Sequence, residues 1–195
     1  MAKRVMKLSA AAIAIAAFAA GSSINSLLPD REAVLNETFP VHGTVEQAVE
    51  IRTGSVSVGD VGTARTVTRF GATAQTSAVF LTFTVTYVPN GIETSVAPIE
   101  VEGGNSHVFG GIQPYGGLLK CGASQAGLAV SCPLAVEIAK DALAGASVRI
   151  YNYSSASGDD VAVIDLGISE EDATELIATA GTFEIADPSY GGAKP

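Results

Sequence analysis

Two cysteines and two histidines are the residues of this chain whose types are best suited to chemistry. Cys121 and Cys132 are eleven positions apart, and neither has a cysteine or histidine beside it at the spacing of a zinc ligand set. The C-x-x-C pair of a redox enzyme is also absent from the sequence. In an exported domain two cysteines most often form a disulfide, and the amino end of this chain indicates export. We therefore expect a structural Cys121–Cys132 bridge, with no metal and no cofactor.

The two histidines lack the sequence context of a catalytic site. His42 adjoins Gly43 in a polar segment, where an exposed side chain is its ordinary state, and His107 follows Ser106 in a glycine-rich stretch. No G-x-S-x-G nucleophile elbow occurs, because the second glycine of 122–127 comes one place too late. Phosphate-binding loops, G-x-G-x-x-G and H-E-x-x-H are missing as well. The sequence predicts no catalytic residue and a protein that is not an enzyme.

The first thirty residues have the order of an exported or membrane-anchored chain. Lys3, Arg4 and Lys7 come first. An uncharged run from Leu8 follows, and Asp30 is the first acidic residue. This order of charges retains the amino end in the cytoplasm and places the rest of the chain outside. We expect a single-pass protein of the cell membrane whose carboxyl domain lies outside the cytoplasm, away from ATP, NAD and nucleic acid.

Two fates are open for the leader, residues 1–29. Its dense apolar part, 8–20, has the length of a signal-peptide core, and 17–19 offers a small-x-small cleavage site. The run that starts at Leu8 and ends at Leu28 carries no charge over 21 residues, and about 20 suffice to cross a bilayer. The leader is therefore either a signal-anchor helix, which we take as the first expectation, or a signal peptide whose removal leaves a secreted domain.

The part of the chain that follows the leader is strongly acidic. Three of the 11 Lys and Arg lie in the leader, so 8 face the 20 Asp and Glu, and the net charge changes from −9 to −12. Such a charge argues against binding to nucleic acid and to anionic lipid headgroups.

Beyond Thr44 the sequence is typical of short strands separated by turn residues. The clearest strand is 79–88, where two residue classes alternate with strict period two. One of its faces is rich in hydroxyls and is expected to be solvated. The other presents Leu81, Phe83, Val85 and Tyr87 to a core. Further strands are expected at 45–51, 55–70, 99–102, 134–138, 147–153 and 160–166.

Strands with almost no helix between them predict one all-β domain over residues 44–186, an immunoglobulin-like antiparallel β-sandwich. One short C-terminal helix is expected after Ser169, a plausible N-cap with Asp172 at the capping-box spacing, and it should end before Gly181. Residues 30–43, interrupted by Pro40, are expected to form a linker, and 187–195 a disordered tail.

The strand segment 79–86, VFLTFTVT, is similar to a strand of the telokin-like, immunoglobulin-like extracytoplasmic domains found on actinobacterial membrane-anchored proteins. Segments 43–45 and 55–58 resemble the first strands of that family, and 141–145 resembles the turn before its penultimate strand. The likeness covers about 43–166. It implies a β-sandwich used for adhesion, ligand contact or assembly, and it carries over no active-site residue.

A glycine-rich stretch, residues 103–121, carries more apolar side chains than a loop normally does. They include Pro114 and Leu119 and, as the candidates for contact, Phe109, Ile112, Tyr115 and Leu118. Such folds place contact residues on end loops, and aromatic side chains are the usual anchors of a protein interface. We take these four residues as candidate partner contacts, and the alternative is that they cap the open end of the core.

Two function classes fit these observations. The first is a non-enzymatic, membrane-anchored interaction module, an accessory subunit of a larger membrane or envelope complex with protein partners in or at the membrane. The second is a free-standing secreted domain that binds a ligand or inhibits a target. Subunits that co-purify from solubilised membranes would favour the first, and a lone chain would favour the second.

Overall fold

A computed structural model describes residues 38–91, 93–110, 119–152 and 160–191. The expected leader 1–29, most of the expected linker, and the candidate contacts Ile112, Tyr115 and Leu118 lie outside these residues. Within the described ranges no helix has the length and apolar character needed to cross a membrane.

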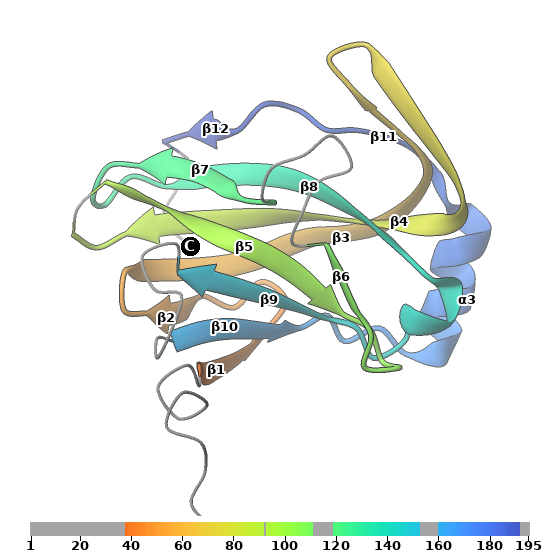
Figure 1. Cartoon of the computed structure of the whole chain (residues 1–195), viewed down its shortest axis with the longest axis horizontal. Helices are drawn as coiled ribbons and strands as arrows, with labels where there is room; N and C mark the ends of the chain where they lie inside the picture. Colours follow the sequence, from red (N-terminus) through yellow and green to blue (C-terminus); the bar gives the residue numbers. More distant parts are fainter. Residues whose placement is uncertain (1–37, 92, 111–118, 153–159, 192–195) are drawn as a thin grey trace, which may run out of the picture. The chain divides into compact units, whose positions relative to one another are not determined.

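The described residues form two six-stranded sheets that pack face to face over a common core (Figure 1). The first sheet contains, in spatial order, β1 (Phe39–Thr44), β10 (Asp160–Asp165), β9 (Ser147–Asn152), β5 (Thr94–Glu102) and β6 (Val108–Gly110), and β7 (Cys121–Ser124) also pairs with β5. The second sheet contains β11 (Gly181–Glu184), β3 (Gly54–Arg69), β4 (Ala72–Pro89), β8 (Val130–Ile138) and β12 (Ser189–Tyr190), and β2 (Val49–Ile51) pairs with β3. A 3-10 turn, η1 (Lys140–Ala142), and helix α3 (Glu170–Thr179) complete the fold.

This arrangement confirms the expected all-β sandwich, and it corrects the expectation that all pairing is antiparallel. β1 runs parallel to β10, and β11 runs parallel to β3. Both exceptions lie at the outer ends of the sheets, where one strand is added to a finished antiparallel core. Period-two patterning specifies which face of a strand is buried but not the direction of its neighbour. The sequence could therefore not distinguish parallel from antiparallel pairing at these strands.

The long strand β4 supplies the centre of the core. Leu81, Phe83, Val85 and Tyr87 are fully buried on its inner face, as predicted. The Tyr87 hydroxyl donates a hydrogen bond to the Thr53 carbonyl at 2.9 Å, and burial raises the pKa of Tyr87. A buried phenol with a partner for its O–H adds apolar burial without leaving a polar group unsatisfied.

The outer face of β4 is not solvated along its whole length, contrary to the prediction. Phe80 is only 6% exposed and Thr82 only 4%. Phe80 forms a second, smaller cluster with Ala64 and Val67 of β3, and Phe183 and Ile185 pack against that cluster. The covering residues come from β11 and the segment after it, about 100 positions from β4, so alternation within β4 could not reveal them.

Both expected domain boundaries need correction. β1 begins at Phe39, inside the segment expected to be a linker, and it includes Pro40. Proline lacks the N–H of a ladder but is tolerated on an edge strand, and β1 is the last strand of its sheet. At the other end, Ser189 and Tyr190 pair with Ser131 and Val130, so this part of the expected disordered tail is a strand.

Helix α3 begins where the sequence predicts. Ser169 is the N-cap, and its Oγ accepts a hydrogen bond from the Asp172 amide at 3.2 Å. Asp172 Oδ2 accepts in return from the Ser169 amide at 3.0 Å and from its hydroxyl at 2.6 Å. These bonds complete a capping box with Asp in place of the usual Glu. They hold the pKa of the Asp172 carboxyl below its ordinary value.

Replacing Ser169 with alanine is expected to lower the free energy of unfolding by about 1 kcal/mol. The same change should raise the pKa of Asp172 towards its ordinary value, measured by NMR titration of the carboxyl, because the hydrogen bonds that favour the ionised form are lost. A depressed pKa in the folded state stabilises the fold above the unfolded-state pKa of Asp, and this contribution is lost as pH falls through the folded-state value. An unchanged Asp172 titration in the variant would contradict this role for the serine.

The predicted Cys121–Cys132 disulfide is present, with 5.5 Å between the two Cα atoms. Cys121 lies on β7 and Cys132 on β8, so the bridge joins the two sheets directly. Both cysteines are buried in the main core. The bridge fixes the distance between the two sheets along β8, which is the last long strand of the second sheet on that side.

Candidate binding groove

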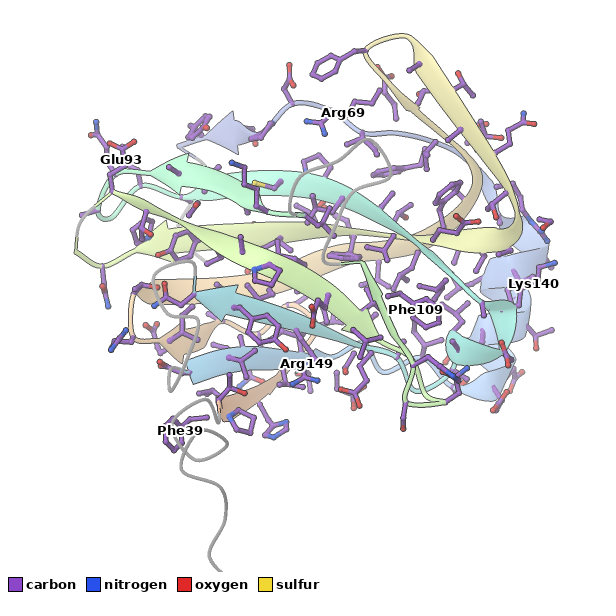
Figure 2. The ribbon with its side chains drawn as sticks, in the orientation of Figure 1. Phe39, Arg69, Glu93, Phe109, Lys140 and Arg149 are labelled. Atoms are coloured by element: carbon purple, nitrogen blue, oxygen red, sulfur yellow. A yellow bond between two sulfur atoms is a disulfide. The ribbon has the colours of Figure 1, made fainter. Side chains whose placement is uncertain are left out.

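Phe109 is the one candidate partner contact that the described ranges include. It lies on β6, opposite Val101 of β5, and its half-buried ring packs against the main core (Figure 2). Core packing therefore explains its position, which agrees with the alternative that the candidate contacts cap the open end of the core. A contact between Phe109 and a partner stays a prediction.

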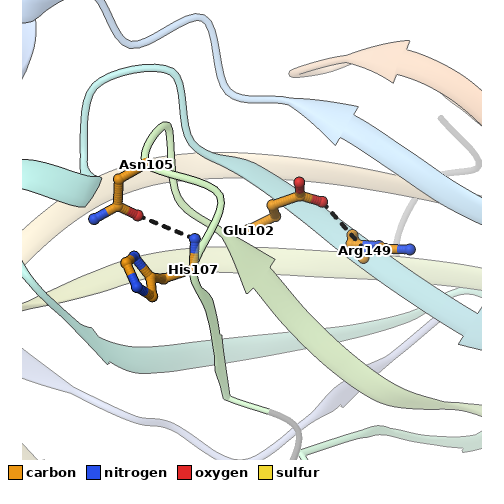
Figure 3. A network of polar contacts seen from close by, with 4 residues as sticks. All are labelled: Glu102, Asn105, His107 and Arg149. Carbon is orange, nitrogen blue, oxygen red and sulfur yellow. Dashed lines mark hydrogen bonds and ion pairs between the residues drawn. The ribbon is translucent and has the colours of Figure 1, made fainter.

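The polar residues near Phe109 form a turn and an ion pair (Figure 3). In the turn between β5 and β6, the His107 amide donates to Asn105 Oδ1 at 3.1 Å. On the neighbouring strands, Arg149 Nη1 lies 3.2 Å from Glu102 Oε2. Both interactions have ordinary structural roles. The hydrogen bond closes a hairpin, and the ion pair joins opposite charges on neighbouring strands. Within the ranges that the structure describes, no three His, Cys, Asp or Glu side chains lie close enough together to hold a metal ion.

A groove of about 560 Å³ lies beside strand β8. Val67 and Ala74 near the end of the β3–β4 hairpin form one wall, together with Phe80 from farther along β4. Residues 134–137 of β8 form the floor. Gly110 and Leu119 from the side of the first sheet and Ile185 from the segment after β11 complete the lining, which is mainly apolar.

The lining pattern places this groove along the edge of β8 and not over one face. Side chains of a strand alternate between its two faces, so a hollow over one face is lined by every second residue. Four consecutive residues, Leu134 to Glu137, line this groove. Leu134 and Val136 belong to the core face, whereas Ala135 and Glu137 lie opposite Thr82 and Phe80 on the outer face. The groove therefore passes around the edge of the strand.

Among the described residues, this edge of β8 has a partner strand over only two positions. On one side β8 pairs with β4 from Val130 to Ile138. On the other side β12 pairs only with Val130 and Ser131, and among the described residues no strand pairs with the rest. An open edge presents a row of backbone donors and acceptors that can bind another strand. Here that row opens into an apolar groove.

Two cations lie at the Leu134 end of the groove. Arg69 lines the groove and also a smaller hollow beside it, whose lining includes Lys120, Pro133 and Pro188. Figure 2 shows Arg69 beside the segment that leads to β12. Its guanidinium lies 5.0 Å from the centre of the Phe70 ring. Its Nε is shielded from solvent and, among the described residues, has no hydrogen-bond partner.

The opposite end of the groove carries a carboxylate. Glu137 lines the groove there, and one of its oxygens accepts a hydrogen bond from the Thr76 hydroxyl. The groove is thus polarised along β8, with positive charge near Leu134 and negative charge at Glu137.

An exposed aromatic ring lies at the tip of the hairpin that forms one wall. Phe70 is 79% exposed, and Phe70 and Gly71 have φ values of 50° and 78°. Positive φ at both central residues is the pattern of a type I′ hairpin turn, for which Asn-Gly is the usual sequence and phenylalanine is unusual. The sequence analysis did not single out this exposed apolar residue. The other groove residues come from distant segments, and no local pattern joins them.

Comparison with models of known protein families, with curated proteins and with solved structures finds no match. The function is therefore inferred from the residues and the geometry of this chain.

Proposed function

We propose that this chain is a non-enzymatic interaction module that acts outside the cytoplasm, anchored to the membrane by its leader. In this proposal it serves as an accessory subunit of a larger membrane or envelope complex. The kinship with immunoglobulin-like domains of actinobacterial anchored proteins belongs to the same proposal. The observation that carries it is the apolar groove at the open edge of β8.

The character of this groove supports a binding role. Soluble domains rarely leave apolar hollows beside an unpaired strand edge, because such edges promote association. Natural folds commonly protect an edge with charge, a bulge or a covering segment. Here β12 covers the first two residues of the strand, and no other described strand pairs with its apolar part on this side. An edge kept open in this way is a suitable contact for a protein partner.

Replacing Ala135 with lysine tests this function. Ala135 is half-buried on the groove side of β8, so a lysine there places a long charged side chain in the groove. We expect wild-type chain, solubilised from membranes of its native host and captured by an affinity tag, to co-purify with other subunits. The amount of co-purified subunits should be at least ten-fold lower with the A135K variant. Ala178→Lys is the matched control, because Ala178 is exposed on α3 and does not line the groove.

The result is interpreted together with the melting temperature and the intact mass of each variant. Equal recovery of subunits with A135K and A178K, from variants that melt alike, would exclude the groove as the contact. A lone chain in every preparation would favour the free-standing secreted domain. A mature amino end near Ala20, read from the intact mass, would remove the anchor from the proposal.

A further inference from the structure

The polarity and the open edge of the groove together indicate what kind of partner it takes. We propose that the groove binds the carboxyl-terminal segment of a protein partner as an added antiparallel strand on β8, with the terminal carboxylate between Arg69 and Lys120. This inference rests on the proposed function, and it adds the chemical class of the partner and its direction.

The groove is suited to a strand more than to an acyl chain. An acyl chain would bury apolar walls but leave the open backbone of β8 without hydrogen-bond partners. An extended peptide satisfies that backbone, and its side chains alternate between two directions. The groove has apolar surface in both directions. Ala135 and Phe80 lie on one side of the edge, and Leu119 and Val136 lie on the other. Apolar residues at successive positions of the peptide would occupy both.

Strand β12 indicates the direction of the added strand. It is antiparallel to β8 and covers Ser131 and then Val130. A peptide in line with β12 on the same edge would also run antiparallel to β8, entering near Glu137 and ending near Pro133. Pro188 precedes β12, and Pro133 lies on β8 at that point. Neither proline has an N–H to continue a ladder, so a chain that terminates there loses little pairing.

The charges match a peptide in this direction. Its carboxylate would arrive at the small hollow lined by Arg69, Lys120 and Pro188. Arg69 brings an Nε that has no hydrogen-bond partner among the described residues, and a carboxylate is the ligand that a guanidinium binds best. Arg69 and Lys120 are two of the six Lys and Arg side chains in the described ranges. Two cations at one hollow of so acidic a chain favour an anionic ligand there.

The test is a binding screen with the purified full chain. The probe is an immobilised library of random hexapeptides with free terminal carboxylates, and the matched probe is the same library with amidated ends. We expect enrichment of peptides with apolar residues near the carboxyl end and at least ten-fold weaker binding after amidation, because charge-assisted hydrogen bonds are lost. N-methylation of alternate peptide amides, chosen to remove the donors that face β8, should also weaken binding.

Substitutions then locate the carboxylate. In Arg69→Gln combined with Lys120→Gln, the free-acid peptide should bind no better than its amide, so the effect of amidation disappears. Lys140→Gln, a cation on η1 outside both hollows, should leave that effect intact. If the double variant melts early, the comparison of acid with amide on wild-type chain still decides the role of the carboxylate.

Five outcomes would overturn the proposal, four of them in the binding screen and its controls. The first is that no peptides are enriched, and the second is that acids and amides bind equally well. The third is that oleate displaces the bound peptides at a lower concentration than a competing free peptide does. The fourth is that the chain forms a dimer and that A135K abolishes this dimer. Binding only after residues 111–118 are replaced by glycine and serine would mean that the chain itself occupies the groove. If the screen fails while A135K still loses its co-purified subunits, the proposed function stands and only the terminal-strand inference is wrong.

Discussion

Replacing Phe83 with alanine is expected to lower the free energy of unfolding by about 3–5 kcal/mol, measured by urea denaturation. Phe83 has no exposed surface and lies on β4 opposite Leu134 of β8, within the core shared by the two sheets. Removing the ring loses its apolar burial and leaves a cavity that surrounding strands, held by ladders on both sides of β4, can only partly close.

Phe70→Ala is the matched control for this change. The same ring is removed, but Phe70 is 79% exposed at the hairpin tip, so the free energy of unfolding should change by about 0.5 kcal/mol at most. If both variants lost similar stability, the hairpin tip would be part of the folded core. If neither did, Phe83 would not lie at the centre of the sandwich.

Removing the disulfide is expected to have the second largest effect. A variant with Cys121→Ala and Cys132→Ala should lose about 3 kcal/mol, because the bridge closes a short loop and restricts the unfolded chain. Alanine is preferred to serine because both positions are buried, and a buried hydroxyl without a partner would add a separate penalty. The sandwich should still fold, since the main core draws on both sheets beyond the bridge.

Peptide mapping without reducing agent provides the check on this prediction. The wild-type chain should yield a peptide pair that joins Cys121 to Cys132. Free thiols at both positions in native protein would contradict the bridge. A double-alanine variant as stable as wild type would show that the bridge contributes nothing to folding. If the groove binds the proposed carboxyl-terminal peptide, the same variant should also bind it more weakly, because Lys120 precedes Cys121 and Pro133 follows Cys132.

Local patterns were most informative where a strand is buried by its immediate neighbours. In β4 the alternation that ends at Tyr87 identified the inner face correctly, because burial of one face imposes period two on the sequence. The same holds for the start of α3, where Ser169 and Asp172 interact over three positions. For the disulfide, the chain has only two cysteines, so one intramolecular pairing was available, and the structure contains it.

Patterns failed where a segment is stabilised by contacts with a distant one. Pro40 suggested a linker, yet Phe39–Thr44 is a strand because the edge of β10 pairs with it. The tail beyond Asp187 looked disordered, yet Ser189 and Tyr190 pair with β8. A strand of two residues is too short to show a period in the sequence. Ser189 and Tyr190 therefore form a strand only through their pairing with β8.

For function, the sequence by itself determined an all-β chain with an expected leader, a disulfide and no recognisable catalytic motif. The tertiary structure decided which residues line the groove to which we assign partner binding, because the groove combines a hairpin tip, one edge of β8 and the segment after β11. Phe109 illustrates the difference, since its surroundings in the sequence suggested a contact loop and β6 directs its ring to the core. Whether an apolar residue is buried or available depends on what packs over it, and those residues come from other parts of the chain.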